Sequence, residues 1–342
     1  MPLYMDVHHK MAGWTDEAVT AAHQQDLAVQ HKYGMQYLRE RNNCMHYRFT
    51  LPQSNDPSAG TAAPPPLFTR IQIQTVSWCN RRCAFCPSGK FPVAKAFMPI
   101  TVYHRVINQL RDLQFAGRIS PYLMNESLID RRLPDLIAYT RAHCPESWIA
   151  INTNGDALSE DLLCRLFDAG LNSLDINAYD STAQHEAHLN LVTRVVERRA
   201  DIVCRVGYSN PFFQGENLPR RTKLINCRNL ACWEPRYLAK LATPDLQNRS
   251  GNMPGAYRPG APLALSCPRP FVQMYVNYLG QAVLCCNDWR FEVVMGDTAE
   301  SSLAEIWMND KYQTYRHNLQ QKNRAMPLCS ICDYLAEPTD WE

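Results

Sequence analysis

The chain has 342 residues, 46% of them hydrophobic, which is enough for one large domain and an accessory unit. Its formal net charge of +2 excludes a general attraction to nucleic acid or acidic membranes, and no apolar run approaches the roughly 18 residues that span a bilayer. Fourteen cysteines without a secretory signal favour metal ligation over disulfides, so we expect a cytoplasmic metalloprotein with no nucleic-acid or membrane partner.

Residues 1–50 predict a small α/β extension, with a strand at 3–7 and an amphipathic helix at about 15–33. Residues 51–67 are rich in Pro, Ser, Ala and Gly, a composition typical of a stiff linker between domains. The extension resembles part of a small ferredoxin-like family described as nickel-binding, through Met-Asp-Val-His-His and Lys-Tyr-Gly-Met. Its histidines are metal ligands if the resemblance holds and ordinary surface residues otherwise: His8, His9, His23 and His31.

Strand-like and helix-like segments alternate along residues 68–250, which we expect to form one domain. Strands are predicted at 71–76, 119–124, 148–151, 173–176 and 202–206, and helices at 102–113, 133–143, 162–169 and 184–199. Such alternation predicts an α/β fold, in which right-handed crossovers curl a parallel sheet into a partial (β/α)6 barrel of the TIM type. Catalytic groups then belong at the carboxyl ends of the strands.

Cys79, Cys83 and Cys86 follow the first predicted barrel strand, separated by three residues and then by two. Three thiolates can hold three irons of a 4Fe–4S cluster and leave the fourth iron open. A zinc site is the alternative, but zinc takes four ligands, usually as two separated pairs. The spacing resembles that of the radical S-adenosylmethionine (radical SAM) enzymes. This resemblance implies that the open iron chelates SAM and that an electron from the cluster cleaves it to a 5′-deoxyadenosyl radical.

Polar residues follow the next three predicted strands. The radical SAM resemblance implies that Glu126 accepts a hydrogen bond from the ammonium of SAM, a charge-assisted contact. It also implies that Thr153, Asn154 and Asp175 bind the ribose hydroxyls or the carboxylate of SAM, and that Phe85 packs near the adenine. A solvent-exposed Glu on a strand-end loop and a structural Asn-Gly turn stay open as alternatives.

A second set of cysteines lies in residues 251–342, which predict a small α+β domain. Its members are separated by 18, 44 and 3 positions: Cys267, Cys285, Cys329 and Cys332. Four thiolates close a 4Fe–4S cluster or a structural zinc site, and Cys286 is a surplus thiol. The arrangement resembles the twitch domain, a shortened SPASM domain with one auxiliary cluster. Two further thiols, Cys227 and Cys232, are expected to be buried or idle.

Several segments resemble the radical SAM dehydrogenases of aminocyclitol antibiotic biosynthesis, among them Asn248-Arg249-Ser250-Gly251 and residues 306–312. The resemblance implies oxidation of a secondary alcohol of an aminocyclitol or aminoglycoside to a ketone, with the auxiliary cluster accepting an electron. It places Arg249 at the reacting hydroxyl and implies a flavodoxin- or ferredoxin-type electron donor.

Other functions stay open. A radical SAM enzyme that modifies a peptide would commonly carry a leader-peptide module, which residues 1–40 do not resemble. A redox-neutral epimerase or dehydratase acting on a sugar would need no external electron acceptor. A non-catalytic iron–sulfur or zinc protein would not cleave SAM to 5′-deoxyadenosine.

Overall fold

The structure is a computed structural model that describes residues 67–91, 93–206, 219, 221–230 and 247–335, together with the backbone of three N-terminal strands. These strands, β1 (Leu3–Asp6), β2 (Met35–Arg39) and β3 (Met45–Phe49), form an antiparallel sheet in the order β1-β3-β2. β1 matches the strand predicted at 3–7. The helix predicted at 15–33, most of the linker, the four N-terminal histidines and Cys232 lie outside the described residues.

The second compact unit comprises residues 67–210 and 217–335 and is built on a nine-stranded sheet. Its parallel part contains β4 (Arg70–Ile73), β5 (Arg118–Ser120), β6 (Trp148–Thr153), β7 (Ser173–Ala178), β8 (Ile202–Val206) and β9 (Lys223–Asn229). The predicted parallel sheet is therefore confirmed. The strand order is β4-β5-β6-β7-β9-β8, so β9, which the sequence analysis missed, lies between β7 and β8.

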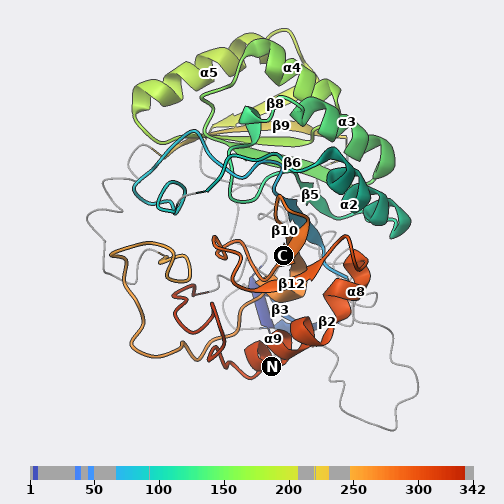
Figure 1. Cartoon of the computed structure of the whole chain (residues 1–342). Helices are drawn as coiled ribbons and strands as arrows, with labels where there is room; N and C mark the ends of the chain where they lie inside the picture. The colour runs from blue at the N-terminus through green and yellow to red at the C-terminus, as the bar shows by residue number, and fades with distance from the viewer. Residues whose placement is uncertain are drawn as a thin grey trace. The chain divides into compact units, whose positions relative to one another are not determined.

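Four helices connect the strands: α2 (Ile100–Asp112), α3 (Leu133–His143), α4 (Glu160–Asp168) and α5 (Thr182–Val196). They run side by side along the parallel sheet (Figure 1). Ser159 and Ser181 begin α4 and α5 by accepting hydrogen bonds from the backbone of the first turn, as N-cap residues do. In the described part of the chain, no helix is long and apolar enough to cross a membrane.

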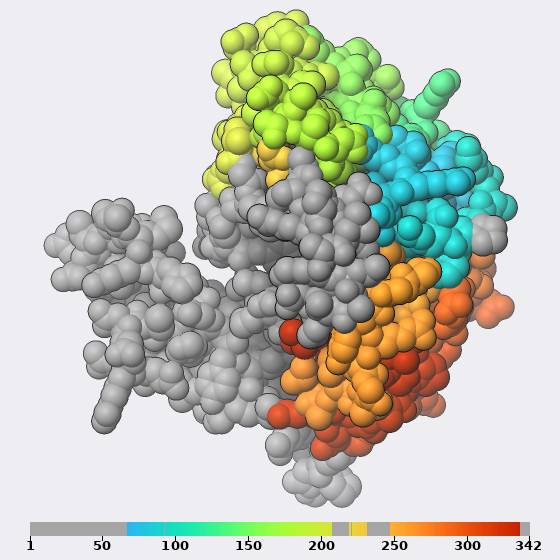
Figure 2. All heavy atoms as spheres, turned by 90° about the vertical axis from the view of Figure 1, so that its left-hand side faces the viewer, coloured from blue at the N-terminus to red at the C-terminus, as the bar shows by residue number. Residues whose placement is uncertain are grey.

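The C-terminal segment adds its strands to the same sheet. It contains α7 (Arg269–Val272), β10 (Gln273–Val276), β11 (Gln281–Val283), β12 (Val294–Asp297), α8 (Leu303–Met308) and α9 (Asp310–Gln320). β10 pairs in parallel with β4, and β11 and β12 follow in antiparallel order. Figure 2 shows the orange surface of this segment against the blue and cyan surface of the segment after residue 67.

Two buried clusters hold this unit together. One joins the first barrel strand to the C-terminal segment through Ile71, Tyr275 and Trp307, and the rings of Trp307 and Phe68 form a T-shaped pair with centroids 5.2 Å apart. The other packs α3, α4 and α5 on the sheet. Only β10 lies between β4, which leads into the first cysteine loop, and β11, which leads into Cys285. Both cysteine regions therefore extend from neighbouring strands of one sheet.

Candidate active site and auxiliary cluster site

The first cysteine loop folds back on itself after β4. The Cys86 amide donates to the Cys83 carbonyl at 3.1 Å, and the Arg81 amide donates to Cys79 Sγ at 3.4 Å. Burial raises the pKa of the Cys79 thiol to about 11, and the nearby Glu126 and Cys86 add to the rise. Burial also raises the pKa of Cys86. Burial therefore disfavours free thiolates at Cys79 and Cys86, and the irons of a cluster would stabilise them as ligands.

Two residues between the cysteines tie the loop to the ends of β6 and β7. Asn80 Nδ2 and Arg81 Nε donate to Asp156 Oδ2 at 2.8 and 2.6 Å, and Arg81 Nη1 donates to Asp180 Oδ1 at 2.6 Å. Asp156 follows β6 and Asp180 follows β7. These contacts were not predicted from the sequence. Carboxylates directly after strand ends and basic residues inside the loop would have indicated them.

Glu126 is buried beside this loop. Its Oε1 accepts from Thr153 Oγ1 at 2.5 Å and from the Leu128 amide at 3.0 Å, and its Oε2 accepts from the Asn154 amide at 2.8 Å. Burial raises the pKa of Glu126, while these three donors act against the rise. A carboxylate offers about four acceptor positions, so one on Oε2 is left for an ammonium donor. This environment fits the amino group of SAM.

Asn154 also reaches the cysteine loop, and Phe85, which belongs to that loop, reaches the end of β7. Asn154 Nδ2 donates to Asn80 Oδ1 at 2.8 Å and lies 3.8 Å from Cys79 Sγ. The Phe85 ring lies 5.2 Å from the ring of Tyr179, which follows β7. Burial raises the pKa of Tyr179, and the charges of Cys83, Cys86 and Glu126 add to the rise, which agrees with its place beside Phe85. The sequence analysis did not identify Tyr179.

Asp175 lies deeper in the sheet than the other predicted SAM contacts. It belongs to β7 and is 2% exposed, with Oδ1 accepting from Asn226 Nδ2 at 2.5 Å and Oδ2 from Arg228 Nη2 at 2.8 Å. Both partners come from β9, the strand that was not predicted. Asp175 therefore already ties β7 to β9, and its predicted role in binding SAM stays a prediction.

The second set of cysteines lines one cavity. Cys267, Cys285, Cys329 and Cys332 face it together with Arg269 and Arg324, whereas Cys286 does not line it. Among the described residues, no three His, Cys, Asp or Glu side chains converge closely enough to hold a single metal ion. Four thiols around one cavity can supply all four protein ligands of a closed 4Fe–4S cluster. Cys227, the thiol expected to be idle, is buried on β9 and hydrogen-bonds with Cys204.

Arg249 lies in a strained turn between the two cysteine regions. Arg249 and Ser250 have φ values of 53° and 54°, which non-glycine residues rarely adopt. The fully buried Asn248 holds the turn: its Nδ2 donates to the Ile331 carbonyl at 2.8 Å, and its Oδ1 accepts from the Gly251 amide at 3.1 Å. Strain held in this way is characteristic of functional sites.

The charge of Arg249 reaches both sides of the turn. It opposes the rise in the pKa of Cys86 and the rise in the pKa of Asp333, both of which burial causes. Asp333 follows Cys332 directly and accepts from the Asn248 amide at 2.6 Å. Ser250, the next residue, lines the cavity of the second cysteine set. The turn therefore connects the two sites.

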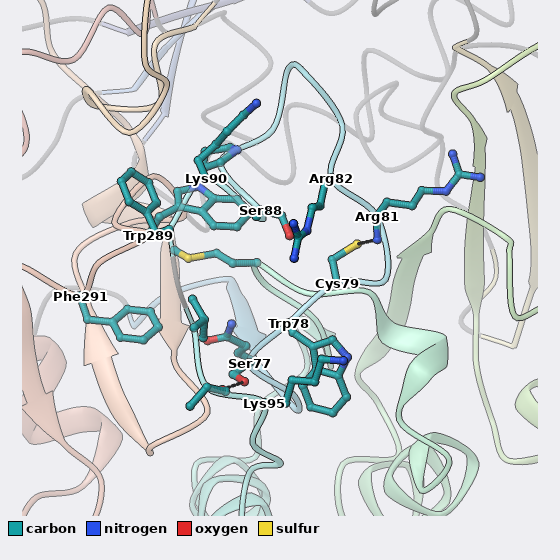
Figure 3. Close-up of a pocket in the computed structure, with 17 residues that line it drawn as sticks. Ser77, Trp78, Cys79, Arg81, Arg82, Ser88, Lys90, Lys95, Trp289 and Phe291 are labelled. Carbon is teal, nitrogen blue, oxygen red and sulfur yellow. Dashed lines mark hydrogen bonds between the residues drawn. The ribbon is translucent and has the colours of Figure 1, made fainter.

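A separate cavity of about 610 Å³ opens beside Cys79. Its wall combines the cysteine loop and the segment after it with Trp289 and Phe291 from the loop between β11 and β12 (Figure 3).

Comparison with known proteins identifies the class. Residues 73–205 match the radical SAM superfamily, and residues 267–333 match the SPASM iron–sulfur cluster-binding domain. The chain therefore carries a radical SAM domain followed by a SPASM domain. A radical SAM domain implies SAM and a 4Fe–4S cluster, and a SPASM domain implies auxiliary iron–sulfur binding, so the predicted cofactors are confirmed.

One curated relative is the S-adenosyl-L-methionine-dependent 2-deoxy-scyllo-inosamine dehydrogenase of Niallia circulans, 27% identical over 284 residues that cover 80% of this chain and 96% of the relative. The fold resembles the crystal structure of BtrN in complex with AdoMet and 2-DOIA, with a TM-score of 0.61, 24% identity, and coverage of 81% and 97%. BtrN in an open conformation gives a TM-score of 0.53, 22% identity, and coverage of 81% and 98%. Together with the two domains, the homology supports a radical SAM oxidoreductase.

Proposed function

We propose that this protein oxidises a secondary alcohol of an aminocyclitol or aminoglycoside-type molecule to a ketone. The observation that carries the proposal is the Arg249 turn, which connects the SAM-cluster loop with the auxiliary site. An alcohol oxidised by radical chemistry loses a hydrogen atom, a proton and an electron in total. A site between a radical source and a second cluster suits this sequence. The homology to the Niallia circulans dehydrogenase supports the same reaction class.

When bound, SAM and the two clusters supply a carbon-centred radical and an electron acceptor. We assign Cys79, Cys83 and Cys86 to the SAM cluster and Cys267, Cys285, Cys329 and Cys332 to the auxiliary cluster. Glu126, with its one free acceptor position, holds the SAM ammonium. Asn154 and Thr153 orient this carboxylate, and Phe85 with Tyr179 forms an aromatic wall beside the cluster loop.

Arg249 acts on the hydroxyl oxygen of the substrate. A guanidinium keeps its proton at neutral pH, so Arg249 does not serve as the base. Its role is to donate hydrogen bonds to the oxygen as negative charge develops there, which lowers the barrier to oxidation. Water or another residue accepts the proton. The strained turn fixes the backbone position from which the Arg249 side chain extends.

The test is anaerobic turnover of the reconstituted full chain with SAM, a reductant and a panel of aminocyclitols and aminoglycoside intermediates. We expect a product lighter by two hydrogen atoms, formed in proportion to 5′-deoxyadenosine. Arg249→Lys should lower coupled turnover by about tenfold, because the fork geometry is lost, while uncoupled 5′-deoxyadenosine persists. Arg105→Lys, an exposed change on α2, is the matched control. Formation of 5′-deoxyadenosine with every alcohol left intact would redirect the search to peptides or redox-neutral sugar chemistry.

We also propose the domain boundaries given above, a flavodoxin- or ferredoxin-type electron donor and a cytoplasmic location. Cysteine-ligated clusters need reduced thiols, which supports a reducing compartment.

A further inference from the structure

The cavity beside Cys79 has an unusual wall. Trp78, Phe91, Trp289 and Phe291 supply aromatic surface, and Cys79 places the cavity next to the SAM-cluster loop. Its volume of about 610 Å³ is in the range of small-molecule sites. Because the Trp289–Phe291 loop follows Cys285 and Cys286 in the chain, the cavity draws on both cysteine regions. A molecule bound there would contact both.

The charges of the wall all have the same sign. Four basic side chains line the cavity, and no Asp or Glu is among its lining residues: Arg81, Arg82, Lys90 and Lys95. Arg81 points away from the cavity in Figure 3 and is paired with Asp156 and Asp180. Within the described ranges, the side chains of the other three make no hydrogen bond or ion pair. Among the described residues, the wall therefore offers two positive charges without a partner, those of Arg82 and Lys95, beside that of Lys90.

Arg82 is positioned at the centre of this wall. Figure 3 shows its guanidinium between Ser88 and Cys79. Gly89 makes room for the stem of Arg82, because a Cβ at Gly89 would lie only 2.6 Å from Arg82 Cγ, and its φ of +78° also favours glycine. The indole N–H of Trp289, which also lines the cavity, is buried without a hydrogen-bond partner. The guanidinium of Arg82 thus borders a space that has no carboxylate among its lining residues.

We propose that this cavity binds an anionic, oxygen-rich group, a phosphate ester or a carboxylate, on the alcohol that the enzyme oxidises. The identification of the ligand as substrate rests on the proposed function. Arg and Lys donors form charge-assisted hydrogen bonds with such groups, and the aromatic side chains provide flat apolar surface for a sugar or cyclitol ring. An amino group alone would meet only positive charges here.

A competing explanation is that the cations merely balance the thiolates of the cluster. Lys90 does act in this way, because its charge opposes the rise in the pKa of Cys86, as Arg249 does. Arg81 has the same effect on Cys79. The test therefore uses Arg82 and Lys95, and it measures iron content and cluster reduction potential in each variant, so that anion binding and charge balance of the cluster are separated.

The experiment titrates the reconstituted full chain anaerobically with glucose 6-phosphate, glucuronate, glucose and glucosamine. Calorimetry gives the affinities, and Trp78 and Trp289 provide a fluorescence signal. We expect one or both anions to bind, with an affinity that falls as salt is raised, and the neutral and cationic sugars to bind at least about tenfold more weakly. Arg82→Gln and Lys95→Gln should each weaken anion binding by about tenfold. Arg105→Gln should leave it unchanged, and all three should retain the iron content of the wild type.

Equal affinity for glucose and glucose 6-phosphate, or anion binding unaffected by both variants, would overturn the inference. So would a change in cluster reduction potential in Arg82→Gln without a change in anion affinity. Anion binding that depends on Arg82, with no alcohol oxidised, would sustain the site and refute the proposed function. Oxidation of an unphosphorylated alcohol with a KM insensitive to Arg82→Gln would sustain the proposed function and refute the anion site. The ratio of glucose 6-phosphate to glucuronate affinity separates phosphate from carboxylate.

Discussion

Replacing Glu126 by Gln tests the proposed SAM site most directly. The carboxylate accepts three hydrogen bonds from Thr153, Leu128 and Asn154, and an amide has one oxygen to share among these donors. The more favourable orientation of the new side-chain amide places its oxygen toward the donors of Thr153 and Leu128. The amide NH2 then faces the Asn154 N–H, a donor against a donor, at a position that is only 4% exposed.

Glu126→Gln should affect SAM binding and folding stability to different extents. The SAM ammonium loses a charge-assisted acceptor, a loss of about 1.5–3 kcal/mol, so SAM should bind about 10- to 150-fold more weakly. Unfolding stability should move little at neutral pH. Burial raises the pKa of Glu126 in the folded protein. Its contribution to the free energy of unfolding is therefore fully present below the ordinary pKa of 4.5 and declines as pH rises through the pKa of the folded state. Removing the buried charge thus offsets the lost hydrogen bond.

The assay is SAM titration of the reduced, reconstituted variant, followed by the spectrum of the cluster and by calorimetry, with thermal unfolding in parallel. Glu300→Gln, on an exposed turn, is the matched control. SAM affinity within about twofold of the wild type would refute the assignment of Glu126. Weak SAM binding accompanied by a collapse in melting temperature would instead show that Glu126 supports the fold.

Three further predictions concern the auxiliary site, the turn and the fold. Cys329→Ser should lower iron content from about eight to about four atoms per chain while SAM cleavage persists and ketone formation stops; iron analysis with product assays checks this, and full iron retention would contradict it. Asn248→Ala leaves the Ile331 and Tyr257 carbonyls without their donor, so the free energy of unfolding should fall by about 2–4 kcal/mol and coupled turnover should drop; denaturant melts measure it, with Gln320→Ala at the exposed last residue of α9 as control. Glu160→Gln should lower the melting temperature at neutral pH, because Arg194 and Arg198 depress the pKa of Glu160. That stabilisation is present above the ordinary value of 4.5 and is lost as pH falls through the folded value, so the two melting curves should converge in acid and in high salt.

What the sequence predicted well was local. The spacing of Cys79, Cys83 and Cys86 is a property of eight consecutive residues, and the helices show their apolar period over single segments. β8 has the predicted bounds, and α3 does as well. The strand predicted at 119–124 ends at Ser120, because Asn125 Oδ1 accepts from the Leu123 amide and turns the chain out of the sheet. Such side-chain contacts are not visible in a hydrophobic pattern.

What it missed depends on contacts between distant residues. β9 lies between β7 and β8, held by Asp175 with Asn226 and Arg228, and its position follows from long-range pairing. The Arg81 contacts to Asp156 and Asp180 join residues 75 and 99 positions apart. The parallel pairing of β10 with β4 joins residues about two hundred positions apart. Periodicity along one segment carries no information on such pairs.

The charge of the cavity and the name of the relative together narrow the substrate. The Niallia circulans dehydrogenase acts on an inosamine, which carries an amino group, whereas the cavity beside Cys79 is lined by cations and by no carboxylate. A ring that bears both an amino group and an anionic group, a phosphate ester or a carboxylate, would satisfy both observations, because the anionic group can occupy the cavity while the amine stays hydrated. Under the proposed function, such rings are therefore the compounds in which oxidation and anion binding should be found in the same molecule.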